Sequence, residues 1–502
     1  MDNLSHLLYF LPVIALSGGG IILMIMSGFK NVKIQTFAFV TMGFLTLSVI
    51  TGLLNLGKLY SQKPFPLVLN GMYIADSLSS YFTLMLIGGG IFTMLVGKHY
   101  FERRDYFRGE FFALFLFSIF GMSMLVHANE LITAFISLEI ASLSIYTMTG
   151  FNRANNRRIE AAFKYMTLGA FAGSFYLLGS LLIYLKTKTT LLGNIGIYLS
   201  SHQVSDLSLV QLGGAAVIML IFFKISAFPF QSWTIDVYEG APLPVTGFMA
   251  ATFKIAIFGF LLRLMVVDFD TISYTWHQLF YWLTMLTIAY GSFLATIQKS
   301  IKRMLASSSI VHTGYMLIAI SSIQEIGEKA TLSIIFYLVA YFLSAIGSFG
   351  LLSYITSDER LRITYDDFKG FAKDHPYMAA MMSIFMFSLA GIPGTIGFIG
   401  KFYIFTSAIE SHNYILAVIG ILATFISVYY YFKLIAVMYF YERTHMKNAP
   451  KLKGLSPKII GFVALLILWG GMGNSHILFI PGVDFLINMA QISYNSLLLP
   501  FK

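Results

Sequence analysis

The sequence predicts an all-α integral membrane protein with about 14 transmembrane helices. Of its 502 residues, 57% are hydrophobic and only 11% are charged, and the mean hydropathy is +0.76. A soluble domain carries about 25% charged residues, so this chain has too little charge to cover its apolar residues with a water-facing surface. Apolar runs of about 20 residues, the length that crosses a bilayer, recur throughout the chain. They are too long and too continuously apolar for the strands of a membrane barrel.

Fourteen such runs follow one another from the N-terminus. The first lacks the charged start and small-residue cleavage site of a secretory signal, so we expect it to be a retained span. The runs cover residues 7–26, 37–54, 74–96, 111–127, 131–149, 161–185, 209–230, 245–267, 276–297, 304–323, 330–355, 377–409, 414–439 and 459–480.

The distribution of lysine and arginine predicts the orientation. With the N-terminus outside, 21 of the 33 basic residues fall in inward loops and 6 in outward segments. Cytoplasmic loops carry an excess of Lys and Arg. We therefore expect both termini on the outer side of the membrane, and the net charge of +10 reflects this topology.

Composition also excludes several classes of function. There is no Cys, so the chain has no disulfide, no zinc–thiolate site and no iron–sulfur cluster of its own. The sequence lacks the kind of basic cluster, interleaved with aromatic residues, that predicts nucleic-acid binding. No pair of histidines has the spacing of a helical metal site.

The remaining six basic residues lie inside the runs and indicate where function resides. Arg263 and Lys433 are close to the ends of their runs, and we interpret them as snorkelling to the interface. Lys254 lies 9 residues from one end of its run and 13 from the other, too deep for its stem to reach water. Burying an unpaired charge there costs at least about 3 kcal/mol. The six are Lys164, Lys224, Lys254, Arg263, Lys401 and Lys433.

Three further groups complete the set of deep titratable side chains. Glu139 is the only acid deep in a run, and Asp76 sits at the mouth of one. His312 is also central. A histidine satisfied within the core is the alternative interpretation for His312, and snorkelling is the alternative for Lys164, which lies four residues into its run.

Two runs carry a lysine near a predicted helix break. Pro229 follows Lys224 by five residues, and Gly391-Ile-Pro393-Gly394 precedes Lys401. Non-helical backbone at membrane depth is tolerated where it lines protein or a watery cavity. The second of these runs comes five runs after the first. A repeat of five helices, an odd number, places its second copy upside down in the membrane, so the pattern predicts two inverted five-helix repeats of the kind found in transporters. The predicted segments are 1–109 (three helices), 110–268 (first repeat), 269–440 (second repeat) and 441–502 (last span and tail).

These stretches resemble a known family, the N subunit of bacterial respiratory complex I, the proton-translocating NADH:quinone oxidoreductase. The resemblance rests on FKISAFPFQSWTIDVYEGAPLPVTGF from Phe223, ISLEIASLSIY around Glu139, EAAFKYMTLGAFAGS around Lys164, SSSIVHTGYM around His312 and GIPGTIGFIGKFYIF around Lys401. It extends over the whole chain. The YEGAP turn and the lysine of GFIGKF favour the N subunit over its M-type and L-type paralogues.

The resemblance implies a charged axis at mid-membrane: Glu139 paired with Lys224, Lys164 beside them, Lys254 at the centre, His312 as a relay, and Lys401 in the far half. It implies no redox cofactor in this chain, because those belong to partner subunits. The implied partners are membrane-arm subunits, including an adjacent M-type subunit and small K-, J- and A-type subunits, together with membrane lipid.

The expected function is proton translocation through two half-channels joined by this axis and driven by quinone reduction elsewhere in the complex. A subunit of a multisubunit sodium/proton antiporter is the alternative, because such subunits share the fold. A purely structural membrane subunit is a third possibility. Protons are favoured over sodium, because a protonated lysine does not ligate Na⁺ and a single deep carboxylate makes a poor sodium site.

Overall fold

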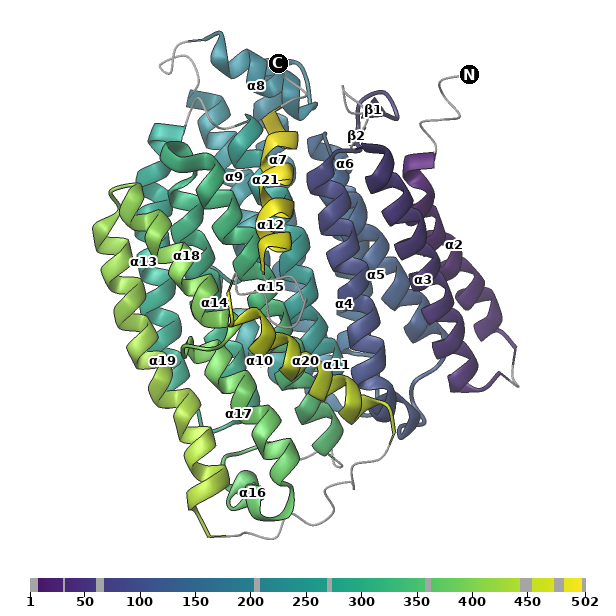
Figure 1. Cartoon of the computed structure of the whole chain (residues 1–502). Helices are drawn as coiled ribbons and strands as arrows, with labels where there is room; N and C mark the ends of the chain where they lie inside the picture. The colour runs from purple at the N-terminus through teal and green to yellow at the C-terminus, as the bar shows by residue number, and fades with distance from the viewer. Residues whose placement is uncertain are drawn as a thin grey trace.

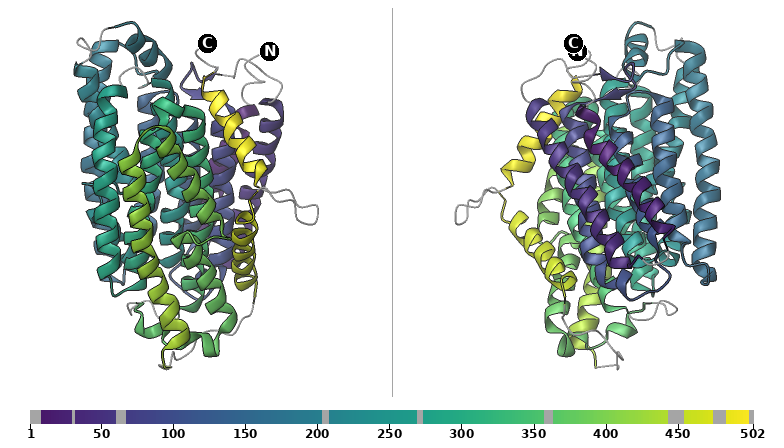
Figure 2. Two further views of the ribbon diagram at one scale, coloured as in Figure 1. Left: turned by 60° about the vertical axis from the view of Figure 1, so that its left-hand side comes forward. Right: turned by 90° about the vertical axis from the view of Figure 1, so that its right-hand side faces the viewer.

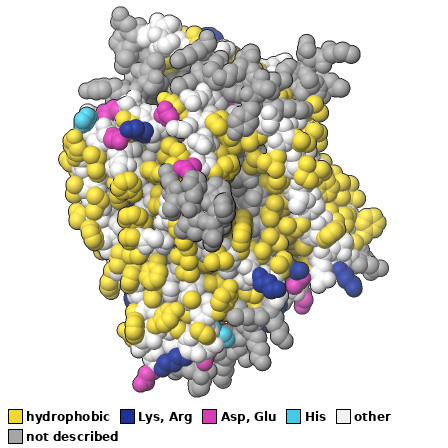
Figure 3. All heavy atoms as spheres, viewed as in Figure 1, with side chains coloured by type: hydrophobic (Ala, Val, Ile, Leu, Met, Phe, Trp, Pro, Cys, Tyr) yellow, Lys and Arg dark blue, Asp and Glu magenta, His cyan; other side chains and the backbone are white. Residues whose placement is uncertain are grey.

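The computed structural model is a bundle of long helices that run roughly side by side (Figure 1). It describes residues 8–29, 32–59, 67–202, 208–268, 273–356, 363–442, 454–473 and 483–498. Twelve helices in these ranges are long and apolar enough to cross a membrane. Figure 3 shows apolar side chains over the middle of one face, with most charged side chains towards its two ends. The prediction of a helical membrane protein is confirmed.

The first half of the bundle follows the predicted runs closely. A small hairpin of two strands and a short helix, α8, lie at the end of the bundle that carries both termini (Figure 1). The elements are η1 (Leu8–Phe10), α2 (Leu11–Ser27), α3 (Ile34–Leu59), β1 (Leu67–Val68), β2 (Tyr73–Ile74), α4 (Ser77–Glu102), α5 (Gly109–His127), α6 (Leu131–Thr149), α7 (Asn156–Thr187), α8 (Leu192–Ser200), α9 (Ser208–Ile225), α10 (Ser232–Gly240), α11 (Leu243–Phe248), the π-helical η3 (Met249–Phe253), α12 (Lys254–Arg263) and the π-helical η4 (Leu264–Asp268).

The second half contains a split helix and a longer, kinked one. The predicted run 377–409 is divided between α17 and α18, and α15 contains a non-helical residue, Ile326, near its start. The predicted boundary between the repeats, 268/269, falls at the edge of the described residues. The elements are α13 (Ser273–Ile297), α14 (Ile301–Ser321), α15 (Ile323–Ile355), η5 (Asp366–Phe368), α16 (Phe371–Asp374), α17 (Pro376–Ala390), α18 (Ile396–Glu410), α19 (Tyr414–Phe440), α20 (Ser456–Gly470) and α21 (Asp484–Leu498).

The last span differs from its prediction. A single helix was expected over 459–480, but α20 ends at Gly470, and residues 474–480 lie outside the described residues. A second helix, α21, follows, and the two lie one above the other along the edge of the bundle (Figure 2). Ser456 at the start of α20 donates to the carbonyl of Leu95 on α4, while Ser496 near the end of α21 accepts from the backbone N–H of Leu78. Both α20 and α21 therefore contact α4.

The helices at the centre of the bundle differ from those at its rim in burial. In the apolar windows of Leu243–Val266 and Ile301–Ser321 every residue is buried, whereas less than half of the corresponding windows of α3, α7, α13 and α19 is buried. The rim helices expose large apolar side chains such as Phe39, Phe171 and Phe425, as lipid-facing helices do. Lys254 and His312 thus lie on the two most enclosed spans.

Arg263 is not a snorkelling residue, contrary to our interpretation of the sequence. It is 1% exposed, and its guanidinium lies 2.9 Å from the fully buried carboxylate of Asp76 and 3.3 Å from the carbonyl of Val126. The same carboxylate caps α4 by accepting from the backbone N–H of Ser79 at 2.8 Å. The pair joins the N-terminal three-helix segment to α12, and the sequence concealed it because the partners are 187 positions apart.

Replacing Arg263 with methionine is expected to destabilise the chain by about 3–5 kcal/mol, because it leaves the Asp76 carboxylate buried without a cation. The matched control is Lys98→Met, which breaks an exposed pair with Glu102 at 4.0 Å and should cost less than about 1 kcal/mol. Thermal unfolding in detergent measures both. Equal stability losses in the two variants would contradict the importance of the buried pair.

Candidate functional site

Lys224 lies at the first interrupted helix. α9 ends at Ile225, Ser226 takes a positive φ of 64°, and Pro229 occupies the turn before α10. The Lys224 side chain is 1% exposed, and its Nζ donates to Ser142 Oγ at 2.7 Å and to Tyr146 Oη at 2.8 Å. Both acceptors belong to α6 and are neutral hydroxyl groups.

Glu139 and Lys224 do not form the ion pair that the family resemblance implied. No oxygen of Glu139 lies within 4.0 Å of Lys224 Nζ, and Glu139 Oε1 is buried without a hydrogen-bond partner. The two groups instead face neighbouring glycines of α7: a Cβ added to Gly173 would lie 3.7 Å from Glu139 Oε1, and one added to Gly169 would lie 3.7 Å from Lys224 Nζ. The carboxylate and the ammonium are therefore near one stretch of α7 without touching.

Lys164 lies apart from these two groups, which corrects its expected place beside them. Its side chain is 42% exposed and makes ion pairs with Glu160 at 2.7 Å and with Asp236 at 3.2 Å. Position in the run did not separate snorkelling from function, and the structure places this ammonium at a polar pocket near the helix end.

Lys254 is bound entirely by oxygen atoms of α14. Its Nζ donates to the carbonyl of Ser309 at 2.6 Å, to Ser309 Oγ at 2.7 Å and to Thr313 Oγ1 at 2.7 Å. Thr313 Oγ1 in turn donates to the carbonyl of Ile225, the residue after Lys224, at 2.7 Å. One hydroxyl group thus connects the first helix break with the central lysine.

His312 directly precedes Thr313 on α14, and its ring forms hydrogen bonds with two tyrosines. Its Nδ1 lies 2.6 Å from Tyr337 Oη and its Nε2 lies 3.0 Å from Tyr431 Oη. The ring of Tyr341 lies close to both this histidine and Lys254: its centroid is 4.8 Å from the imidazole and 5.4 Å from Lys254 Nζ. These tyrosines are distant from His312 in sequence, so the periodicity of the sequence did not predict this cluster.

Lys401 lies at the second interrupted helix. α17 ends at Ala390, Gly391 takes a φ of 81°, Pro393 occupies the break, and Lys401 Nζ donates to the Ala390 carbonyl at 2.9 Å. A helix C-terminus carries unsatisfied carbonyls and a partial negative charge, so it stabilises a cation. The ammonium also lies 4.9 Å from the ring centroid of Tyr315, which packs against His312.

These contacts join four of the six predicted residues into one line across both halves of the bundle, without Glu139 and Lys164. It runs from Lys224 and Ile225 through Thr313 to Lys254, then past Tyr341 to His312, and past Tyr315 to Lys401. We call it the lysine axis. Every ammonium in it is at most 3% exposed and is bound by hydroxyls or carbonyls. Sequence reasoning found the charged members and missed the hydroxyl groups that connect them.

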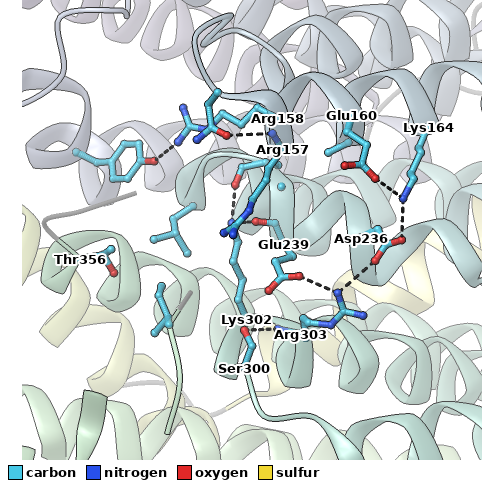
Figure 4. A pocket seen from close by; sticks show the side chains of 17 residues that line it. Arg157, Arg158, Glu160, Lys164, Asp236, Glu239, Ser300, Lys302, Arg303 and Thr356 are labelled. Carbon is cyan, nitrogen blue, oxygen red and sulfur yellow. Dashed lines mark hydrogen bonds and ion pairs between the residues drawn. The ribbon is translucent and has the colours of Figure 1, made fainter. Parts of the chain in front are cut away.

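A polar pocket is lined by charged side chains of α7, α10 and α14 (Figure 4). It has a volume of about 220 Å³, and its walls come from the ends of α4 and α15, the starts of α7 and α14, and α10. Within the ranges that the structure describes, no cluster of His, Cys, Asp and Glu has the arrangement of a metal site. The pocket is lined mainly by charged and polar side chains rather than by an apolar surface for a cofactor.

Comparison with known proteins assigns the chain to a family. Residues 128–427 match the family described as NADH:quinone oxidoreductase/Mrp antiporter, TM. NADH-quinone oxidoreductase subunit N 1 of Solibacter usitatus is 36% identical over 481 residues, which cover 96% of each chain. A chain in the structure of respiratory complex I from Thermus thermophilus with bound aureothin is 28% identical, with a TM-score of 0.77 over 92% of this chain and 97% of that one.

A third comparison concerns the fold alone. A chain of the Mrp complex from Dietzia sp. DQ12-45-1b reaches a TM-score of 0.84 over 99% of this chain and 98% of its own, at 17% identity. The antiporter and complex I subunits thus share this architecture, and sequence similarity separates them. On that evidence the chain belongs to the NADH:quinone oxidoreductase/Mrp antiporter family and, within it, to the subunit N proteins of NADH-quinone oxidoreductase.

Proposed function

We propose that this chain translocates protons in the membrane arm of an NADH:quinone oxidoreductase, driven by quinone reduction in other subunits. The observation that carries the proposal is the lysine axis, in which buried ammonium groups are held by neutral oxygens. A structural ion would be paired, because an unpaired buried charge is costly. Lysine suits proton transfer because a buried amine has both a neutral and a charged form within reach.

The proposed cycle uses the separation between Glu139 and Lys224. An ion pair at 4 Å is worth about 4 kcal/mol at an effective dielectric of 20, and the membrane potential opposes each proton by about 2.3 kcal/mol per 100 mV. The two energies are comparable. Closing the pair holds a proton on Lys224, and opening it releases that proton towards Lys254, from which it passes by His312 to Lys401.

The location of the redox cofactors, the neighbouring subunits and the membrane are part of the same proposal. Redox cofactors sit in partner subunits, and the neighbours are an M-type subunit and the small K-, J- and A-type subunits. The membrane is the bacterial inner membrane, with both termini outside. The start of α2 and the end of α21 lie at the same end of the bundle (Figure 1), which supports an even number of crossings.

A multisubunit sodium/proton antiporter is the second candidate, favoured by the TM-score of 0.84 to the Mrp chain. Purification distinguishes the two. Co-purification with quinone-reducing subunits supports the complex I assignment. A redox-free assembly of small membrane proteins would support the antiporter.

Proton pumping by the reconstituted complex tests the mechanism. Glu139→Ala and Lys224→Ala are each expected to lower the number of protons moved per electron while leaving the assembled complex intact. A purely structural role predicts instead that these variants gain thermal stability and pump normally. Full pumping stoichiometry in both variants would exclude the proposed cycle.

A further inference from the structure

Both ring nitrogens of His312 have a tyrosine hydroxyl as their hydrogen-bond partner. Nδ1 lies 2.6 Å from the Oη of Tyr337 on α15, and Nε2 lies 3.0 Å from the Oη of Tyr431 on α19. All three side chains are at most 3% exposed. The histidine and the two tyrosines therefore form a buried chain of three groups that each bind and release protons.

A tyrosine hydroxyl leaves the protonation of a histidine open. A backbone carbonyl only accepts a hydrogen bond, so it fixes the nitrogen that carries the proton. His127 is held in this way, because its Nδ1 lies 2.8 Å from the carbonyl of Ile74. A hydroxyl both donates and accepts. With a hydroxyl at each nitrogen, the two neutral tautomers of His312 and its doubly protonated form all keep two hydrogen bonds, as a residue that changes protonation during turnover requires.

Tyr337 lies on the side of His312 that faces Lys401. It packs against Gly400, the residue before that lysine: a Cβ added to Gly400 would lie 2.8 Å from Tyr337 Cδ2. The ring centroid of Tyr337 is also 6.2 Å from that of Tyr315, whose ring centroid lies 4.9 Å from Lys401 Nζ. Nδ1 is thus the nitrogen directed towards the far end of the lysine axis.

We propose that Tyr431 and Tyr337 are the proton-transfer partners of His312, the first delivering a proton to Nε2 and the second carrying one from Nδ1 towards Lys401. This inference rests on the proposed function. It adds two uncharged residues to the lysine axis and gives the passage by His312 a direction, from the α19 side of the ring to the α15 side.

The transfer balances at each atom. In the starting state Nδ1 carries the proton of the neutral ring, and Tyr431 donates to Nε2. A proton from the Lys254 ammonium, carried by water, binds Tyr431 Oη as the hydroxyl's own proton passes to Nε2, and the ring becomes a cation. The Nδ1 proton then passes to Tyr337 Oη, whose own proton passes through water to the neutral amine of Lys401. One ammonium is lost at Lys254, and one forms at Lys401.

The three groups are polarised in the opposite sense after one transfer. Nε2 now carries the ring proton and donates to Tyr431, while Tyr337 donates to Nδ1. A second proton cannot follow in the same direction until the ring and both hydroxyls have reoriented. His312 and its two tyrosines therefore pass one proton for each reorientation, which opposes continuous leakage along the axis.

The test is Tyr337→Phe and Tyr431→Phe in the assembled complex, reconstituted in vesicles, with Tyr176→Phe as the matched control. Tyr176 is also buried, but its hydroxyl donates to the carbonyl of Leu131 at 3.0 Å, outside the axis. Each variant of the triad is expected to slow single-turnover proton uptake at least about tenfold, the low end of what a positioned proton-transfer group contributes. Tyr176→Phe should behave as the parent protein. Assembly and uncoupled electron transfer should be retained in all three variants.

The acidity of the hydroxyl separates proton transfer from packing, and it keeps the inference testable if a phenylalanine variant fails to assemble. Fluorotyrosine at position 337 keeps the ring and the hydroxyl but makes the hydroxyl more acidic. We expect the rate of proton uptake to change stepwise as fluorine atoms are added at position 337 and to stay constant when they are added at position 176. The same rate with tyrosine and with fluorinated tyrosine at position 337 would overturn the inference.

The outcomes separate this inference from the proposed function. Normal proton uptake in either Tyr337→Phe or Tyr431→Phe, together with a loss in Lys254→Met, would overturn the tyrosine relay and leave the lysine axis standing. Normal uptake in all three variants would overturn the proposed function itself.

Discussion

Replacing Lys254 with arginine is expected to stop proton transfer along the lysine axis as fully as replacing it with methionine. Arginine keeps the positive charge but does not lose its proton in proteins, and the proposed cycle requires a neutral amine. Positioned proton-transfer groups contribute about 10²–10⁴-fold, so proton flux through this chain should fall at least about 100-fold in either variant. Proton uptake after a pulse of NADH measures it in vesicles that contain the complex.

The matched control for this prediction is Lys329→Arg. Lys329 lies on α15 and makes an exposed ion pair with Glu410 at 2.8 Å, outside the axis. Its substitution preserves that pair, and normal flux is expected. If Lys254→Arg pumps normally, the lysine serves only as a fixed charge and the relay is wrong.

Replacing Gly391 with alanine should impair proton transfer at the far end of the axis. Gly391 takes a φ of 81°, and a Cβ there would lie 2.8 Å from Lys401 Cδ and 3.3 Å from Lys401 Nζ. The substitution therefore moves the ammonium away from the Ala390 carbonyl that binds it. Proton uptake by the complex is expected to fall while the quinone-reductase rate in uncoupled vesicles is retained.

The same helix break supplies the control. Gly394 has a φ of 86°, but a Cβ there meets no atom within 4 Å. Both substitutions carry the penalty of placing alanine in the left-handed region, roughly 1–2 kcal/mol. Only Gly391→Ala also displaces Lys401. Equal losses of proton uptake would indicate that backbone strain, rather than the position of the lysine, explains the result.

The sequence predicted that Lys224, Lys254 and Lys401 are deeply buried, because depth follows from position in a run. Lys254 and His312 lie in the middle of the fully buried spans Leu243–Val266 and Ile301–Ser321, and Pro229 and Pro393 lie in the interrupted segments. A proline removes a backbone donor wherever it stands, so the position of a break is local information. The helical membrane fold follows from the same apolar runs.

The residues that these buried side chains contact were not predictable in the same way, because such contacts depend on how distant helices pack. Lys224 binds the hydroxyls of Ser142 and Tyr146 instead of the Glu139 carboxylate. Arg263 appeared close enough to a helix end to reach water, yet Asp76, from another segment, holds it in the interior. Opposite charges at suitable depth do not determine contact, since rotation about the helix axis decides which face each side chain occupies.

The last crossing shows a further limit of hydropathy. One apolar run predicted one helix, but Gly470 ends α20 and a second helix forms from Asp484. α21 contains polar residues that pack against α4, for example Ser496. Packing against the rest of the bundle stabilises this helix although its sequence is only modestly apolar.

The most direct test of the lysine axis is the ratio of protons translocated to electrons transferred, measured in vesicles containing the complex with Lys254→Met. The uncoupled electron-transfer rate of the same preparation shows whether the complex is intact. We predict a lower ratio than in the parent complex, with electron transfer retained. An unchanged ratio would show that protons do not pass by Lys254 and would contradict the proposed function of this chain.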